Sequence, residues 1–98
     1  MIVYSGVIID INKTQGRGDS SMRGDMKQYR TGQFILTDKN RTQFCITGEN
    51  GRADWIDKMS VGDHIEVMCD TKVIKAKSGI WFHKNELYEI IEHKQKQP

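Results

Sequence analysis

NGRADWIDKMSVGD, residues 50–63, interrupts a chain that otherwise alternates between apolar and polar residues. Ala53 to Met59 can form about two helical turns. Such turns would place Trp55, Ile56 and Met59 on one side of the helix. The stretch therefore predicts a short helix between segments that have the two-residue period of β-strands.

Two strand-like segments precede this helix. YRTGQFILTD (29–38) and TQFCITG (42–48) are separated by the polar turn KNR (39–41). Alternation places Phe34 and Leu36 on the inward face of the first segment. The two segments therefore predict a β-hairpin.

Three further segments complete the pattern: VYSGVIIDINKT (3–14), HIEVMCDTKVIK (64–75) and IWFHKNELYEII (80–91). The last could be strand or helix by composition, and its aromatic and β-branched residues favour a strand. Gly6, inside the first segment, predicts a bend or bulge there. The sum is an all-β chain of five strands with one short helix between strands three and four, which matches the OB-fold barrel.

Length and composition describe one small domain. The chain has 98 residues, of which 37% are hydrophobic and 29% charged, an ordinary balance for a soluble protein. We expect the OB-fold domain to cover residues 1–92 and a polar C-terminal tail to cover residues 93–98. No apolar run has the length of a membrane span, and the N-terminus lacks the features of a signal peptide. Cys45 and Cys69 form no CxxC pattern and are predicted to be reduced thiols. We therefore expect a cytoplasmic protein with no membrane contact.

Basic residues gather in two segments, although the net charge is only +2. Residues 13–43 hold seven basic and three acidic residues, and residues 72–84 hold four basic and no acidic residues. Each segment therefore carries a net charge of +4, and the rest of the chain carries −6. In an OB-fold these segments cover the first loop with strands two and three, and the last hairpin, which are regions that bind oligonucleotides. We expect them to converge on one groove that follows a phosphate backbone; charge spread for solubility is the alternative.

Single-stranded nucleic acid also needs aromatic rings on which bases can stack. Tyr29 lies on the outward face of its predicted strand. Trp81 stands at the predicted hairpin tip, and because Phe82 has the opposite parity, only one of the two should face solvent. We expect that one to be Trp81, with a place in the core as the alternative, and we expect Trp55 to anchor the helix. The candidate nucleic-acid-binding residues are Arg17, Arg23, Lys27, Tyr29, Arg30, Arg41, Lys72, Lys75, Lys77 and Trp81.

The segment GRGDSSMRGD, residues 16–25, contains Arg-Gly-Asp twice. That tripeptide is known as a cell-adhesion signal, but a cytoplasmic location disfavours this reading. Glycine and serine in residues 15–27 predict a long loop between the first two strands. Arg17 and Arg23 on this loop can reach phosphates or stack on bases.

The segments SGVIIDI, QFILTD, QFCITG, VGDHIEV and SGIWFHKNELYEI follow one another in the order and spacing of a known group of proteins. Over residues 2–91 the chain resembles small bacterial and phage OB-fold proteins similar to single-stranded-DNA-binding and primosomal replication proteins. This resemblance implies binding of single-stranded DNA through strands two and three and the two basic loops. It also implies a homodimer or homotetramer that acts in replication, recombination or repair. Replication proteins would then be among its partners.

One departure from the resemblance concerns the C-terminus. The main bacterial single-strand binders end in an acidic tail that recruits partners, whereas this sequence ends EHKQKQP (92–98), which is basic. We therefore expect an accessory role instead of a recruiting hub.

No sequence pattern indicates catalysis. His64, His83 and His93 show no metal-binding spacing, and the chain contains neither GxSxG nor a P-loop. We therefore expect a non-enzyme with no catalytic residues, no metal and no cofactor.

An alternative function stays open beside nucleic-acid binding. The protein could be an OB-fold interaction or assembly subunit, with Ile35, Cys45 and Tyr88 forming an outward apolar patch. The sequence also leaves open whether DNA or RNA is the ligand.

Overall fold

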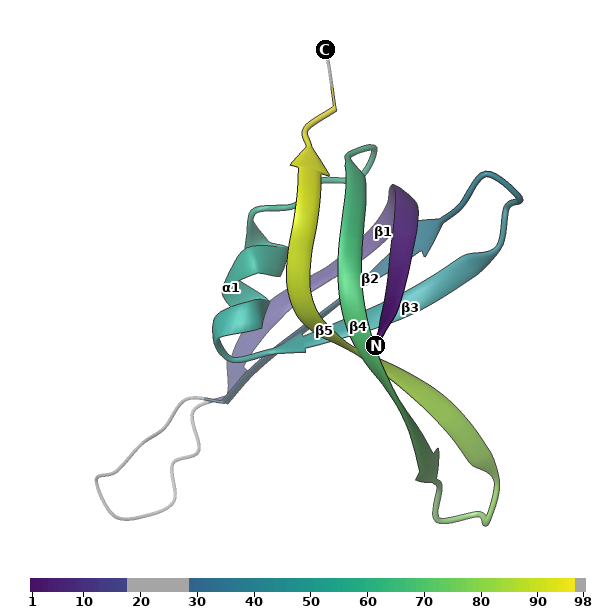
Figure 1. The fold of residues 1–98 in the computed structure, drawn as a ribbon. Helices are drawn as coiled ribbons and strands as arrows, with labels where there is room; N and C mark the ends of the chain where they lie inside the picture. Colours follow the sequence, from purple (N-terminus) through teal and green to yellow (C-terminus); the bar gives the residue numbers. More distant parts are fainter. Residues whose placement is uncertain (18–28, 97–98) are drawn as a thin grey trace.

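The computed structural model describes residues 1–17 and 29–96, with the backbone alone described at residues 14–17 and 29. Over these residues the chain forms a closed five-stranded β-barrel with one short helix between β3 and β4 (Figure 1). The elements are β1 (Ile2–Arg17), β2 (Tyr29–Thr37), β3 (Gln43–Glu49), α1 (Gly51–Asp57), β4 (His64–Lys75) and β5 (Trp81–Lys94). The predicted OB-fold-like barrel is therefore confirmed. Among the described helices, none has the length and apolar character needed to cross a membrane.

The barrel closes in the order β1-β2-β3-β5-β4, and β1 pairs with both β2 and β4. Residues 2–7 pair with β4, and residues 7–17 pair with β2, both antiparallel. Gly6 lies just before this change of partner, where a Cβ atom would collide with the Thr37 carbonyl and the Leu36 side chain. Gly6 therefore lies next to the place where β1 passes from one sheet neighbour to the other. The register shifts of β1 come later, between Ile8 and Asp10 and between Asn12 and Gln15.

The interior of the barrel is filled from every strand and from the helix. Phe34 and Leu36 point inward, as their alternation predicts. Trp55 is 36% exposed and does not anchor the helix as expected, because Ala53 and Ile56 are the residues of α1 that are buried. The residues of the core are Ile8, Phe34, Leu36, Ile46, Ile56, Met59, Ile65, Val67, Cys69 and Leu87.

The strand β5 continues to Lys94, past residue 91 where the sequence pattern ends it. Asp63, which precedes β4, holds this end of the strand. Its carboxylate accepts hydrogen bonds of 2.9 Å from the backbone N–H groups of Ser60 and Lys96, and it lies 2.7 Å from Nε2 of His93. These contacts connect the turn before β4 to the end of β5, and the apolar pattern of the sequence carries no sign of them.

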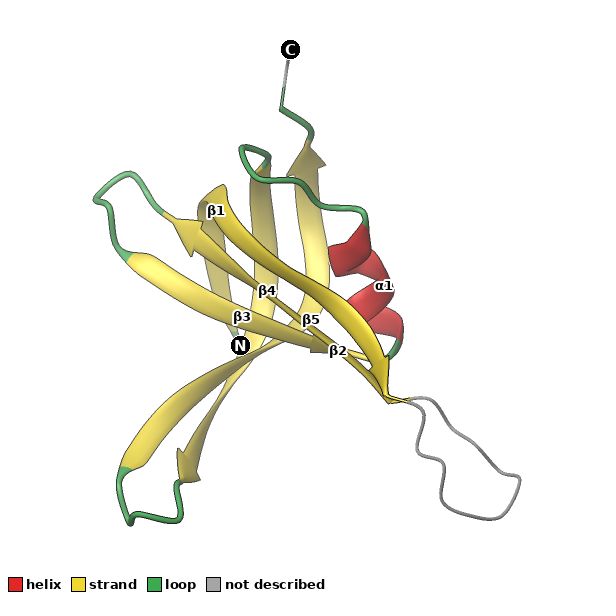
Figure 2. Ribbon diagram, turned by 180° about the vertical axis from the view of Figure 1, so that it is seen from behind, coloured by secondary structure: helices red, strands yellow, loops and turns green. Residues whose placement is uncertain are grey.

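The strands β4 and β5 extend beyond the barrel as a two-stranded arm, defined here as residues 72–84. Along β4, pairing with β1 reaches no further than Cys69, and along β5, pairing with β3 begins at Asn85. The pairing between β4 and β5 nevertheless continues to Lys75 and Trp81. Figures 1 and 2 show this hairpin standing clear of the barrel.

Candidate nucleic-acid interface

The arm brings together four of the residues that the sequence predicts for binding: Lys72, Lys75, Lys77 and Trp81. Lys75 and Trp81 are cross-strand partners, and Nζ of Lys75 lies 5.5 Å from the centroid of the Trp81 ring. A cation this close to an aromatic face is attracted by the ring quadrupole. Trp81 is 62% exposed, so it lies outside the core, and its ring is available to another flat group.

Phe82 is also exposed, at 47%, so the expectation that only one of Trp81 and Phe82 faces solvent is wrong. Phe82 pairs with Ile74 in the arm. Alternation decides burial only where a core lies beneath the sheet, and beyond the barrel neither face of the hairpin is packed against another described element. The sequence indicates that this hairpin projects beyond the barrel. The segments 64–75 and 80–91 are longer than the segment 42–48, so their joined ends extend past it.

At the base of the arm, carboxylates hold two lysines. Nζ of Lys72 lies 2.9 Å from Glu86, and Nζ of Lys84 lies 3.1 Å from Glu49. The hydrogen bond to Glu86, together with the negative charge of this residue, raises the pKa of Lys72. Among the described residues, the ion pairs do not include Lys75 or Lys77, so the uncompensated positive charge of the arm lies toward its tip.

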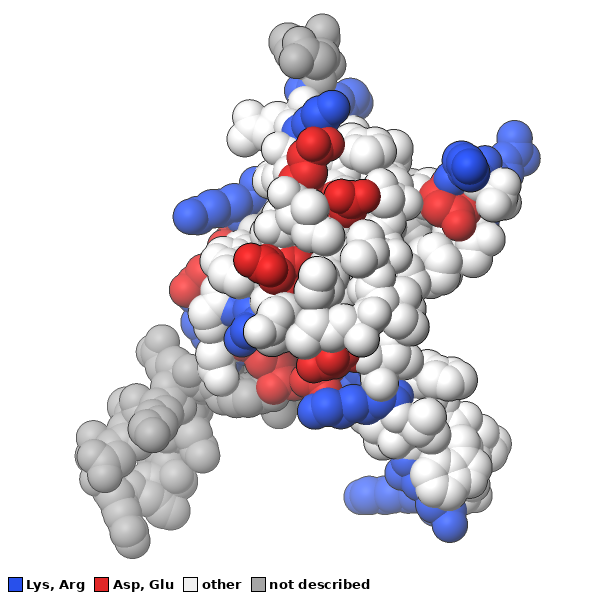
Figure 3. All heavy atoms as spheres, in the orientation of Figure 1, with Lys and Arg blue, Asp and Glu red and all other residues white. Residues whose placement is uncertain are grey.

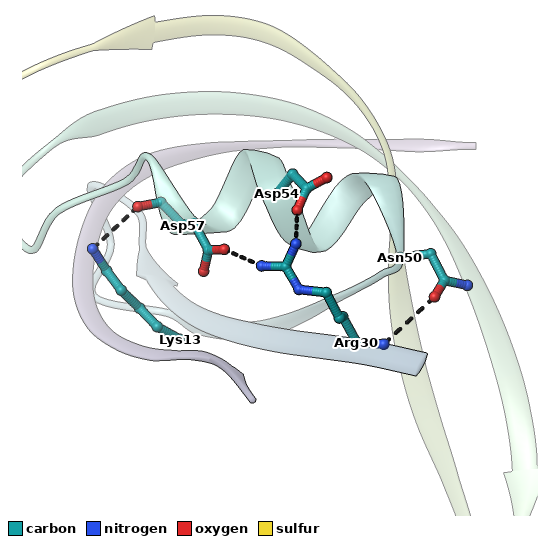
Figure 4. A network of polar contacts seen from close by, with 5 residues as sticks. All are labelled: Lys13, Arg30, Asn50, Asp54 and Asp57. Atoms are coloured by element: carbon teal, nitrogen blue, oxygen red, sulfur yellow. Dashed lines mark hydrogen bonds and ion pairs between the residues drawn. The ribbon is translucent and has the colours of Figure 1, made fainter. Parts of the chain in front are cut away.

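Arg30 lies away from the arm and contacts the helix instead (Figure 4). Its guanidinium group forms ion pairs with both Asp54 and Asp57 of α1, and its side chain is 31% exposed. Its backbone carbonyl accepts a 2.8 Å hydrogen bond from the N–H of Asn50, at the start of the helix. Nζ of Lys13 adds a 3.2 Å hydrogen bond to the carbonyl of Asp57. This geometry favours a structural role in which Arg30 fastens the helix to the start of β2, a role that residue type alone does not distinguish from phosphate binding.

Arg41 lies in the turn between β2 and β3, where its φ is 64°. Figures 1 and 3 place this turn and its basic side chains at a different corner of the molecule from the arm. The structure therefore does not bring Arg30 or Arg41 to the lysines of the arm.

The remaining predicted residues lie at or within the connection between β1 and β2. The backbones of Arg17 and Tyr29 pair with each other where the two strands end. Arg23 and Lys27 lie outside the described residues. The convergence of this basic connection with the arm stays a prediction.

The outer face of β2 and β3 carries polar residues of little charge. Nε2 of Gln33 donates a 3.2 Å hydrogen bond to Oγ1 of Thr47 across the two strands. A hollow of about 100 Å³ opens beside Asn12, Ile35 and Cys45. Among the described side chains at the outer positions of these two strands, none is basic or aromatic. Within the described part of the chain, the lysines and the tryptophan that the sequence predicts for binding therefore come together on the arm and not on this face.

A larger cleft of about 330 Å³ lies where β3 meets α1, beside β5. Three carboxylates line it, from Glu49, Asp70 and Glu86, which disfavours phosphate. The guanidinium carbon of Arg52 lies 5.6 Å from the ring centroid of Tyr88 at this cleft. Tyr88 is therefore part of the surface near α1, and it does not join Ile35 and Cys45 in one apolar patch.

The two cysteines are free. Cys69 is buried, and this burial together with the negative charge of Asp70 raises the pKa of Cys69 to about 12. Cys45 is exposed on β3, and partial desolvation raises its pKa as well. A nucleophilic cysteine needs a lowered pKa, so neither thiol has that character. In the described part of the chain, no cluster of histidine, cysteine and acidic residues is arranged to hold a metal ion.

The fold and the arm define a protein with an OB-fold-like barrel and one projecting basic, aromatic hairpin. No family model, curated protein or solved structure matches the chain.

Proposed function

We propose that this protein binds single-stranded nucleic acid, with DNA as the first ligand to test, and that it does so without catalysis. The observation that carries the proposal is the arm. An exposed Trp81 ring stands beside the ammonium group of Lys75, in a segment of four lysines without a carboxylate. This combination of a stacking ring and cations is what sequence-tolerant binding of a single strand requires.

The side chains of the arm are proposed to contact different parts of the nucleic acid, according to their chemistry. A base stacks on the free area of the Trp81 ring, since every base offers an aromatic face. Lys75 and Lys77 neutralise the adjacent phosphates and release condensed counterions. Arg17, Arg23, Lys27 and Tyr29 are proposed to extend this contact from the other basic segment.

The cellular setting of this binding follows from the resemblance that the sequence carries. We propose a role in replication, recombination or repair, in the cytoplasm, with a homodimer or homotetramer as the binding form. This part of the proposal rests on the sequence segments that resemble single-strand binders.

Fluorescence anisotropy with labelled oligo-dT tests the proposal, and oligo-U compares RNA with DNA. We expect binding at low salt, and we expect Trp81→Ala to weaken it by about 1–3 kcal/mol, the value of one stacked base. Trp55→Ala is the matched control, because Trp55 is also exposed but lies on α1, away from the arm. Absence of binding at low salt would contradict the proposed function, and equal losses in both variants would contradict the role of Trp81.

A second function is favoured by the exposed apolar residues of β1. Val3, Val7 and Ile9 alternate along one face of β1 and are each between 38% and 50% exposed, which is an unusual row for one strand. An interaction or assembly subunit would cover this row with a partner. Light scattering beside a gel-shift titration separates the two functions, because such a subunit forms a stable complex or oligomer and shifts no oligonucleotide.

A further inference from the structure

The tip of the arm exposes large apolar side chains on both of its faces. Val73, Ile80, Trp81 and Phe82 are 57%, 68%, 62% and 47% exposed. The register explains how both faces become apolar, because Trp81 and Phe82 are neighbours in one strand and therefore point to opposite faces. A strand of nucleic acid that follows one groove would cover only one of these faces.

The arm is also a defined structure and not a loose loop. Between Asn85 and the tip, the two strands of the arm pair only with each other among the described residues. This pairing continues up to Lys75 and Trp81. At about 3.3 Å per residue, the paired part projects on the order of 13 Å from the barrel. A tight turn closes it, with hydrogen bonds of 2.8 Å from Ala76 N–H to the Ile80 carbonyl and 2.9 Å from Gly79 N–H to the Ala76 carbonyl. Gly79 has a φ of 89°, which suits glycine.

We propose that the tip of this arm recognises the junction at which a single strand meets a duplex. This inference rests on the proposed function and names its substrate class. The last base pair of a duplex offers a broad, flat apolar surface that is open on one side. A narrow finger with an aromatic ring on each face can place one ring against that surface and the other toward the unpaired strand, in the way that apolar wedges enter between base steps.

The charges of the arm fit the same substrate. Lys75 and Lys77 lie at the end of the arm that carries the exposed apolar residues, and the segment 72–84 contains no carboxylate to repel phosphates. A duplex carries a denser phosphate charge than a single strand, so each neutralised phosphate contributes a larger salt dependence there. The lysines therefore lie at the same end of the arm as the rings, where they can neutralise phosphates next to a junction.

Three labelled probes separate this inference from the proposed function: oligo-dT, a duplex with a dT tail, and a closed dumbbell duplex without a junction or an end. We expect the tailed duplex to bind about tenfold more tightly than oligo-dT, since one further stacking contact corresponds to about that factor. The dumbbell should bind least. Equal affinity for oligo-dT and the tailed duplex would contradict the junction while leaving single-strand binding in place. Binding to none of the probes would contradict both, and a dumbbell that binds as tightly as the tailed duplex would contradict the junction.

The role of the two faces is tested with Phe82→Ala, since Phe82 lies on the face opposite Trp81. We expect this change to lower the ratio of tailed-duplex affinity to oligo-dT affinity about five- to tenfold. Trp55→Ala, on the helix, should leave that ratio unchanged. A fluorescent adenine analogue in the last base pair should change its emission on binding of the unmodified protein and not of Phe82→Ala. An unchanged ratio in Phe82→Ala, or an adenine signal that persists in this variant, would overturn the proposal.

Discussion

A single carboxylate, that of Asp63, holds the end of β5 against the turn before β4. It is 2% exposed, and it accepts hydrogen bonds from two backbone N–H groups and contacts His93. Burial alone would raise the pKa of Asp63, but the hydrogen bond with His93, the two backbone hydrogen bonds and the charge of His93 together lower it. The charged form of Asp63 is therefore the one that the folded structure favours.

This residue makes the stability of the protein dependent on pH. Because the pKa of Asp63 is lower in the folded state, its carboxylate stabilises the fold above the unfolded value of about 3.9, and this contribution is lost as the pH falls through the folded-state pKa. Asp63→Asn should lower the free energy of unfolding by about 1–3 kcal/mol at neutral pH. The difference from the unmodified protein should narrow in acid.

Urea unfolding at a series of pH values measures this effect. Glu89→Gln, which changes an exposed carboxylate on β5, is the matched control and should leave the free energy of unfolding unchanged. A difference between Asp63→Asn and the unmodified protein that stays constant from neutral to acid pH would contradict the account of this residue.

Individual residues show the limits of sequence patterns most clearly. Phe34 and Leu36 are placed correctly because alternation holds wherever a strand covers the core. The basic segment around Arg30 predicts phosphate binding, whereas the pairing of Arg30 with Asp54 and Asp57 depends on a helix that folds over the start of β2. Ion pairs between elements distant in sequence leave no periodic signal.

At the scale of the elements, β1 is the strand on which closure of the barrel depends. It changes its pairing partner near Gly6, where the backbone of β2 approaches closely. The glycine inside an apolar strand predicts a special point of β1, and the structure places there a close approach of the β2 backbone. The strands that pair with β1 before and after Gly6 could not be predicted, since strand pairing follows from the three-dimensional path of the chain.

Gly6→Ala tests this close approach. The added methyl group meets the Thr37 carbonyl, which belongs to the backbone and cannot turn away, so we expect the free energy of unfolding to fall by about 1–3 kcal/mol. Gly51→Ala is the matched control, because nothing lies within 4 Å of the added atom at the start of α1. Denaturant unfolding of the two variants should separate them, and similar values would argue against a close packing at Gly6.

The arm is the element whose apolar residues are predicted to contribute least to folding. Phe82→Ala should change the free energy of unfolding by no more than about 0.5 kcal/mol, because the side chain has no core to lose. Phe34→Ala, which removes the same side chain from the barrel interior, should cost about 3–5 kcal/mol. Thermal or urea unfolding compares the two, and a large loss in Phe82→Ala would mean that the arm packs against part of the protein.

In the whole molecule, basic side chains reach outward at several ends of the fold. Figure 3 shows acidic side chains over the strands of the barrel, and basic ones at the arm, at the turn between β2 and β3, near α1 and near the end of β5. The gathering of lysines in residues 72–84 could be read from the sequence, and the fold class followed from five alternating segments and one short helix. The separation of the arm from Arg41 could not be read from the sequence, because it depends on how far each hairpin projects from the barrel.

The salt dependence of oligo-dT binding tests the central claim most directly. For a single strand, the logarithm of the affinity falls with the logarithm of salt concentration by about 0.7 per neutralised phosphate. The double variant Lys75→Ala with Lys77→Ala should therefore reduce this slope by about 1.4, the share of two phosphates. Lys58→Ala with Lys94→Ala removes two exposed lysines away from the arm and should leave the slope unchanged. A slope that is equal in the arm variant and the unmodified protein would contradict nucleic-acid binding by the arm.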